Sequence, residues 1–117
     1  WETYDGALGD WAASVGALRP HVPDPCEQSY HMYYLLLPSE TIRAELIAHL
    51  KRRGIHSVFH YVPLHTSPMG EHFGGRRGDC PVTEDISDRL LRLPFYNSLS
   101  EIEQNYVIES ILQFGPS

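Results

Sequence analysis

Residues 30–63, YHMYYLLLPSETIRAELIAHLKRRGIHSVFHYVP, contain the strongest local structural signals of the chain. An aromatic and aliphatic run over residues 30–37 ends at Pro38, which is typical of a β-strand terminated by proline. A second such run, residues 55–61, ends shortly before Pro63. The stretch between the two runs has helical periodicity, so the region predicts a strand, a helix and a second strand.

The predicted central helix has a defined beginning and a defined end. Ser39 is a typical N-cap residue, and Glu40 follows it in the first turn, where an acidic side chain suits the helix dipole. Gly54 can adopt the left-handed conformation that ends a helix. The apolar face of this helix is predicted to consist of Ile42, Leu46, Ile47 and Leu50.

The beginning of the chain also shows helical spacing. Apolar side chains recur three and four positions apart, at Trp1, Tyr4, Leu8, Trp11, Val15 and Leu18. Each glycine in this stretch weakens a helix by about 1 kcal/mol, so tertiary packing must stabilise it. The apolar face either packs on the sheet of this domain or covers a partner outside the chain. Because the chain opens on Trp1 within this pattern, we expect it to be a piece of a longer protein.

The second half of the chain predicts a long loop followed by shorter elements. Residues 66–81, TSPMGEHFGGRRGDCP, have the composition of a long mobile loop of the kind that often carries function. Thr83 is expected to cap a short helix that runs to Leu91. Residues 91–95, LRLPF, are expected to form a third strand or extended segment.

The last predicted element is a helix. Ser100 and Glu103 have the spacing of a capping box, and the residues expected to face inward are Val107, Ile108, Ile111 and Leu112. Strands that interleave with amphipathic helices predict a small two-layer α/β (α+β) sandwich, with a mainly antiparallel sheet covered on one face. The 117 residues are expected to form a single domain.

Composition excludes several functional classes. A net charge of −6 argues against a nucleic-acid binder, which needs clustered Lys and Arg on one face. Neither an apolar run of about 20 residues nor a signal-peptide pattern is visible, so we expect a soluble cytoplasmic chain without a membrane span. Cys26 and Cys80 lack CxxC spacing, and no disulfide is expected between them.

Three of the seven histidines, His56, His60 and His65, lie within ten residues. A metal site is one interpretation, but positions four residues apart in a strand are separated by about 13 Å, which is too far for one ion. Hydrogen-bonded structural histidines are the commoner outcome, and Tyr61 can pack in a strand with its hydroxyl bonded. Cysteine–histidine catalysis has less support, because neither cysteine lies in an activating sequence context. We therefore expect no metal.

Four segments together resemble a known family. They are HMYYLLL (31–37), KRRGI (51–55), SVFHYVPLHTSPMGEHFG (57–74) and DRLLRLPFYNSLSEIEQNYVIESIL (88–112). These segments are similar to the C-terminal part of the DegT/DnrJ/EryC1/StrS sugar aminotransferases, and the resemblance runs in one register over residues 1–114. The motifs FHYVPLH and LLRLP are its most specific parts.

The resemblance implies a fold-type-I homodimeric enzyme in which a large domain binds pyridoxal 5'-phosphate and a small C-terminal domain closes the active site. The implied reaction moves an amino group, usually from glutamate, onto the 4-keto carbon of a nucleotide-linked 6-deoxy sugar. This chemistry requires a lysine for the Schiff base. The single lysine, Lys51, lies in the basic last turn of a solvated helix. We therefore expect the catalytic lysine and the cofactor site in a large domain outside these residues, and the chain alone to be inactive.

The same resemblance implies the residues that contact substrate. Tyr61 and His60 are expected to orient the sugar or its diphosphate, and His65 to complete the wall of the pocket. His31 matches a family position near the active site, although core packing is a comparable alternative for this residue.

Arg76 and Arg77 match a loop near the nucleotide-sugar entrance, where they can meet a diphosphate, but a solvated charge run is the simpler interpretation. The Gly74-Gly75-Arg76 stretch departs from the family pattern, which leaves the sugar and the nucleotide open. Two further functional classes stay open as well. The chain could be a free-standing ligand-binding module, or a dimerisation module without catalysis.

Overall fold

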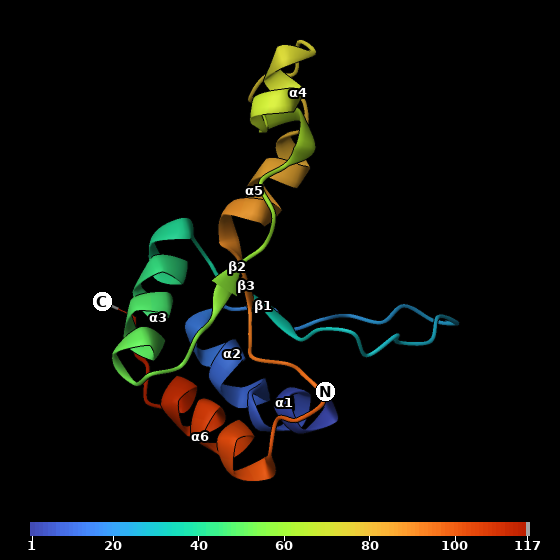
Figure 1. Cartoon of the computed structure of the whole chain (residues 1–117). Coiled ribbons are helices and arrows are strands. Elements are labelled where there is room, and N and C mark those ends of the chain that lie inside the picture. Colours follow the sequence, from blue (N-terminus) through green and yellow to red (C-terminus); the bar gives the residue numbers. More distant parts are fainter. Residues whose placement is uncertain (117) are drawn as a thin grey trace.

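The computed structural model describes residues 1–116, in which short strands alternate with helices (Figure 1). The predicted alternation is confirmed, and additional short helices are present. The elements are α1 (Glu2–Ala7), α2 (Gly9–Val15), β1 (Tyr34–Leu36), α3 (Glu40–Arg52), β2 (Val58–Phe59), the 3-10 helix η1 (Leu64–Thr66), α4 (Pro68–His72), α5 (Pro81–Arg89), β3 (Leu90–Arg92) and α6 (Glu101–Leu112).

The three strands form one antiparallel sheet in the order β1-β3-β2. In the central strand, Leu91 lies opposite Leu35 of β1 and Phe59 of β2. The next residue, Arg92, lies opposite Tyr34 and Val58. The antiparallel sheet that the sequence predicts is therefore confirmed.

The strands are shorter than the predicted segments 30–37 and 55–61. Among the three strands, each outer strand pairs with β3 alone, so the ladders are no longer than the three residues of β3. β3 itself begins at Leu90, directly after α5 and one residue earlier than predicted. It ends before Pro94, whose missing amide hydrogen cannot extend a ladder.

One hydrophobic core lies between the sheet and helices α1, α2, α3 and α6. Leu35 and Leu91 are neighbours on one face of the sheet and are fully buried in this core. Side chains alternate along a strand, so Tyr34 and Arg92 face the opposite side, where they are only half-buried. The fold is the small two-layer α/β arrangement that the sequence predicts. The helices contribute Tyr4, Leu8, Trp11, Ala12, Leu46, Leu50, Val107, Ile108 and Ile111 to the core.

The N-terminal helical stretch consists of two helices rather than one. α1 ends and α2 begins at Leu8, and α2 ends at Gly16, whose φ of 72° suits glycine. Leu18 lies beyond that end, is 61% exposed and forms a backbone bridge to Leu36, so its predicted place on the apolar face is wrong. The rest of that face, with the fully buried Tyr4, packs in the core of this domain.

Both helix caps predicted for the longer helices are confirmed. The amide N–H of Ile42 donates to Ser39 Oγ at 3.2 Å, and the reciprocal capping box of Ser100 and Glu103 opens α6. Leu112, predicted to face inward, is instead 47% exposed. It follows the buried Ile111 by one residue, which turns it about 100° around the helix and out of the core.

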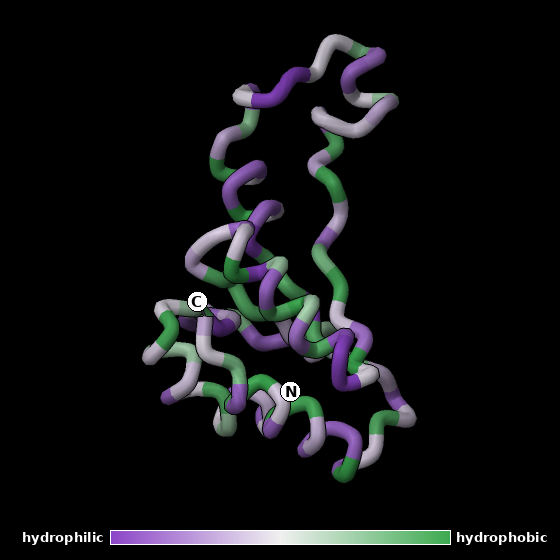
Figure 2. Tube along the Cα trace, turned by 90° about the vertical axis from the view of Figure 1, so that its left-hand side faces the viewer, coloured by the Kyte–Doolittle hydropathy of each residue, from purple (hydrophilic) through white to green (hydrophobic). Residues whose placement is uncertain are grey.

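Two segments leave the compact part of the chain (Figure 1). Residues 20–32 form an extended arm without helix or strand. Residues 60–80, with η1 and α4, form with α5 a projection whose tip lies far from the core. In Figure 2 the two limbs of this projection rise separately from the body. The radius of gyration, 15.4 Å, accordingly exceeds the value of about 13 Å for a compact domain of this size.

The projection corrects two predictions. Residues 66–81, predicted as a loop, contain α4, because Ser67 caps a helical turn whose first residue is Pro68. The next helix, α5, begins at Pro81, so Thr83 lies inside the helix and is not its N-cap.

Residues 1–116 contain no helix that is both long and apolar enough to cross a membrane. Cys26 and Cys80 are exposed and have free thiols. Within the same residues, no cluster of three or more His, Cys, Asp or Glu side chains could hold a metal ion.

Candidate functional site

The chain enters the projection through His60 and Tyr61, directly after β2. Both residues line a cavity of about 410 Å³ between this segment and α5. Its apolar walls include Leu64, Val82 and Ile86. A cavity of this size, lined by apolar side chains with a few polar groups, is typical of a small-ligand site.

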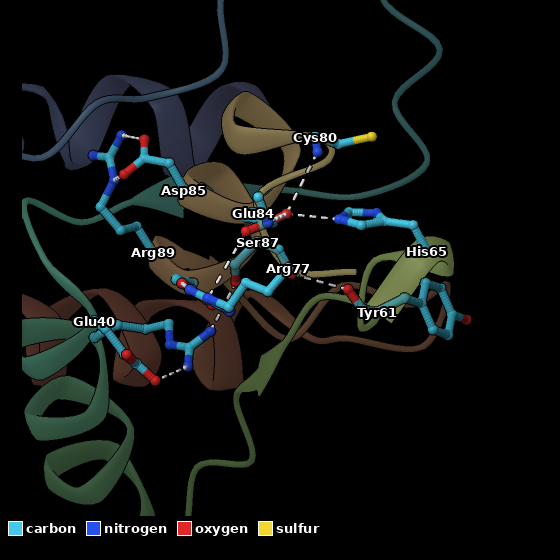
Figure 3. Close-up of polar contacts among 12 residues, drawn as sticks. Glu40, Tyr61, His65, Arg77, Cys80, Glu84, Asp85, Ser87 and Arg89 are labelled. Atoms are coloured by element: carbon cyan, nitrogen blue, oxygen red, sulfur yellow. Dashed lines mark hydrogen bonds and ion pairs between the residues drawn. The ribbon is translucent and has the colours of Figure 1, made fainter. Parts of the chain in front are cut away.

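His60 and Tyr61 lie together at this cavity. Their rings meet edge to face with centroids 5.2 Å apart. Ser87 Oγ of α5 donates to the carbonyl oxygen of Tyr61 at 3.0 Å, while the tyrosine side chain is 75% exposed and points away from Glu84 (Figure 3). The Nδ1 atom of His60 is buried and has no hydrogen-bond partner among residues 1–116. The site thus offers an exposed phenol beside an imidazole with an unused nitrogen.

His65 has a different environment, on the carboxylate of Glu84 (Figure 3). Its Nε2 atom lies 2.7 Å from Oε1 of Glu84, and the Gly78 amide donates to the same oxygen at 2.7 Å. The Cys80 amide lies 3.5 Å from that oxygen. His65 is therefore not among the residues that line the cavity at Tyr61.

Glu84 is the polar centre of the projection. It is only 6% exposed, so the surrounding donors, rather than solvent, stabilise its charge. The hydrogen bond to His65, together with the two backbone amides, lowers the pKa of this carboxyl group. Because these donors come from the segment before α5, Glu84 fastens that segment to the helix.

The two predicted arginines have different surroundings. Arg77 forms an ion pair of 2.6 Å with Asp88 and lies 3.8 Å from Glu84, and the hydrogen bond to Asp88 raises the pKa of its guanidinium. Arg76 is exposed, and its amide N–H donates to Asp79 Oδ2 at 2.8 Å. Arg77 is thus committed to ion pairs within the projection, whereas the side chain of Arg76 faces solvent.

His31 lies on the extended arm, away from the other predicted residues. It is exposed, and its Nδ1 atom lies 2.6 Å from Ser29 Oγ. Core packing, one of the two interpretations of this histidine, is therefore wrong. The structure also leaves His31 outside the lining of the cavity at Tyr61.

The sequence did not single out Glu84. It is one of several acidic residues in amphipathic segments, and its partner His65 is 19 positions away. Neither a motif nor a spacing marks it, because the pairing exists only once the projection has folded back onto α5.

The described residues offer no lysine that fits the aldimine of pyridoxal phosphate. An aldimine lysine requires activation by desolvation or by neighbouring groups. Lys51 is exposed in the last turn of α3 and does not line the cavity at Tyr61. No step of cofactor chemistry is therefore assigned to residues 1–116.

Comparison with known proteins identifies relatives over nearly the whole chain. The DegT/DnrJ/EryC1/StrS aminotransferase family model matches residues 1–112. A dTDP-4-dehydro-2,3,6-trideoxy-D-glucose 4-aminotransferase of Saccharopolyspora spinosa is 33% identical over 108 residues, 91% of this chain and 26% of the relative. A pleiotropic regulatory protein of Geobacillus stearothermophilus is 33% identical over 93 residues, 79% of this chain and 25% of the relative. The chain spans about a quarter of the length of these relatives.

Solved structures agree with this assignment. A DegT DnrJ EryC1 StrS aminotransferase from Brucella abortus is 32% identical with a TM-score of 0.73, over 94% of this chain and 28% of that one. S. venezuelae DesV, solved in complex with a ketimine intermediate, is 25% identical with a TM-score of 0.82, over 96% of this chain and 29% of that one. A putative sugar aminotransferase of Streptococcus pneumoniae, solved in its PLP form, is 26% identical with a TM-score of 0.79, over 94% of this chain and 28% of that one. The chain belongs to the DegT/DnrJ/EryC1/StrS aminotransferase family.

Proposed function

We propose that these residues form the C-terminal small domain of a pyridoxal-phosphate-dependent enzyme that aminates a nucleotide-linked 4-keto-6-deoxy sugar, with glutamate as the amino donor. Family membership supports the reaction class. The span of about a quarter of the relatives supports a separate large domain that carries the cofactor and its lysine. The exposed Lys51 agrees with a catalytic lysine elsewhere.

The proposed acceptor is a dTDP-linked sugar. FHYVPLH and LLRLP resemble the corresponding motifs of dTDP-4-amino-4,6-dideoxygalactose transaminase. The names of the relatives include dTDP-linked 3-amino and 4-amino sugars and GDP-perosamine, so the choice of carbon and nucleotide depends on residues of the large domain. A relative named for spore coat polysaccharide biosynthesis supports a role in surface polysaccharide, lipopolysaccharide or O-antigen synthesis.

The observation that carries the proposal is the placement of Tyr61 and His60 at the cavity beside α5. Tyr61 is proposed to donate a hydrogen bond to the sugar or its diphosphate, with His60 as a second contact. His65 is proposed to act beside them, held by Glu84. Arg76 and Arg77 are proposed to meet the diphosphate at the nucleotide-sugar entrance, and His31 to lie near the active site of the assembled enzyme.

The proposed assembly is a cytoplasmic homodimer. Large apolar side chains are exposed along the projection, where Leu64 is 86%, Phe73 80% and Val82 76% accessible. Clustered apolar exposure of this kind is typical of a contact surface with another polypeptide.

Tyr61→Phe in the full-length protein tests the substrate contact. Loss of one neutral hydrogen bond is expected to lower kcat/KM for the keto sugar about 2- to 12-fold, with cofactor binding unchanged. Tyr34→Phe is the matched control, because Tyr34 lies on the sheet, outside the cavity. Equal losses of sugar turnover and cofactor binding, or no loss of either, would contradict the role of Tyr61.

A second experiment tests the position of the catalytic lysine. Pyridoxal phosphate added to the 117-residue chain should give no internal-aldimine absorbance, whereas the full-length protein should show it. An adduct at Lys51 that borohydride reduces would overturn the assignment.

A second candidate function is a regulatory or dimerisation module without catalysis. The observation that favours it is the 33% identity to a relative named as a pleiotropic regulatory protein. This alternative predicts a full-length product that binds neither pyridoxal phosphate nor a keto sugar, and the same absorbance measurement distinguishes the two.

A further inference from the structure

A second cavity, of about 460 Å³, lies where the sheet meets the segment that leads into α6. It shares no lining residue with the cavity at Tyr61. Its walls combine apolar side chains of the core rim with two basic groups, Arg92 and His56, and with the rings of Phe95, Tyr96 and Tyr106. Its volume lies within the range of small-molecule sites, about 300–1,000 Å³.

Arg92 is the one arginine or lysine in the described lining of this cavity, in a chain whose net charge is −6. Among residues 1–116, the side chains of Arg92 and His56 make no hydrogen bond or ion pair. The one acidic residue in the described lining, Glu103, has its carboxylate occupied by the amide and hydroxyl of Ser100 at 2.9 and 2.7 Å. These two hydrogen bonds lower the pKa of Glu103 and leave it a helix cap rather than a partner for Arg92.

Arg92 lies on β3, the central strand of the sheet. Its backbone pairs with Tyr34 on one side and with Val58 on the other. The residues before and after it, Leu91 and Leu93, are buried in the core, so the guanidinium is on the opposite face of the sheet. A half-buried guanidinium without an internal partner, held on a sheet, is pre-organised to receive an anionic group in its planar fork of donors.

The aromatic side chains offer the rest of the binding surface. Tyr96 and Tyr106 are 53% and 49% exposed, so their rings are accessible to a ligand. The hydroxyl of Tyr106 donates to the carbonyl oxygen of Arg53 at 3.1 Å, which fixes its ring. Aromatic rings beside a guanidinium suit a ligand that joins a flat ring to an anion.

We propose that this cavity binds a free small aromatic anion of the aryl phosphate or nucleoside monophosphate class, with its phosphate on Arg92 and its ring against Tyr96 and Tyr106. The proposal does not depend on the proposed aminotransferase function, because it rests on residues that the cavity at Tyr61 does not include. His56 is the second donor to the phosphate.

The test uses the full-length protein, dialysed to remove free pyridoxal phosphate, and follows its titration with phenyl phosphate by calorimetry. Saturable binding is expected, and Arg92→Gln should weaken it about 10-fold or more, because a charged hydrogen-bonding partner is lost. Arg52→Gln is the matched control, since Arg52 is exposed on α3 and outside the cavity. Inorganic phosphate and phenol, which each supply half of the ligand, should both bind at least about 10-fold more weakly than phenyl phosphate.

Two further variants keep the result interpretable. Arg92→Lys retains the charge and removes the planar fork, so it should bind with an affinity between those of the parent protein and Arg92→Gln. Tyr61→Phe should leave phenyl phosphate binding unchanged. Each of three results would overturn the proposal: no saturable binding of phenyl phosphate, equal weakening of binding by Arg52→Gln and Arg92→Gln, or weakening by Tyr61→Phe alone. Phosphate that binds as tightly as phenyl phosphate would overturn the role of the rings.

Discussion

Gly70→Ala should open the projection, although alanine is the better helix former. Gly70 lies in α4, where its backbone packs against η1. An added Cβ would overlap the carbonyl oxygen of Leu64 and lie 2.8 and 2.9 Å from the carbonyl carbon and Cα of His65. These neighbours are backbone atoms that cannot rotate away. The substitution must therefore move η1 and, with it, the His65 side chain on Glu84.

The expected magnitude follows from two opposing effects. Overpacking against backbone atoms that cannot rotate away is expected in the upper part of the usual range, at about 2–3 kcal/mol. The higher helix propensity of alanine offsets about 1 kcal/mol of that cost. The net effect is a local destabilisation of about 1–2 kcal/mol, which corresponds to a 5- to 30-fold rise in the population of the open projection. Since η1 and α4 contribute none of the buried core, the midpoint of global unfolding should change little.

Hydrogen exchange measures this effect directly. The amides of Phe73, Gly74 and Gly75 donate within the turn that follows α4, and their exchange should accelerate about 5- to 30-fold in the variant. Gly6→Ala is the matched control, because Gly6 is also helical but a Cβ there meets no atom within 4 Å. That control should leave exchange in the projection unchanged. Unaltered protection of the three amides in Gly70→Ala would refute the packing argument.

Two other changes address the core and the polar centre. Leu91→Ala removes a fully buried side chain from the central strand and should lower the free energy of unfolding by about 2–5 kcal/mol. Leu112→Ala, at a 47% exposed position, should lower it by well under half of that. Equal effects of the two substitutions in urea denaturation would contradict the assigned core. Glu84 has a lowered pKa in the folded state, so its charge stabilises the fold above the ordinary carboxyl pKa of about 4.5, and this contribution disappears as the pH falls through the folded pKa. Glu84→Gln should therefore be less stable than the parent protein at pH 7 and lose less stability on acidification. Hydrogen exchange of the projection amides measures this, and parallel pH profiles of the two proteins would refute the role of Glu84.

The sequence predicted those elements whose signals are local. Ser39, Gly54 and the box of Ser100 and Glu103 act within a few residues, and the structure shows them where the spacing indicated. Strand lengths were not predictable in this way, because they depend on pairing with β3, which gives β1 three partners and β2 two. The break at Leu8 lies between Gly6 and Gly9, which weaken the helix, but no spacing in the sequence marks Leu8 as the point of the break.

In the candidate site as well, the local arrangement was predictable from the sequence and the contacts between distant residues were not. His60 and Tyr61 are adjacent in sequence, and the structure brings them to one cavity. The ion pair of Arg77 with Asp88 and the hydrogen bond between His65 and Glu84 connect residues 11 and 19 positions apart. Such pairs arise only when the projection folds back on α5, so a sequence pattern could indicate charge at these positions but not its partner.

The construction of the projection explains why apolar and polar side chains have exchanged their usual roles there. In the body of the domain, apolar side chains such as Leu35 and Leu91 are buried and hold the elements together. In the projection the buried group is the Glu84 carboxylate, and the large apolar side chains are exposed. Charge-assisted hydrogen bonds position this segment without burying its apolar side chains. Leu64 and Phe73 therefore stay available for contact with another surface, and Tyr61 keeps its hydroxyl accessible at the base of the same segment.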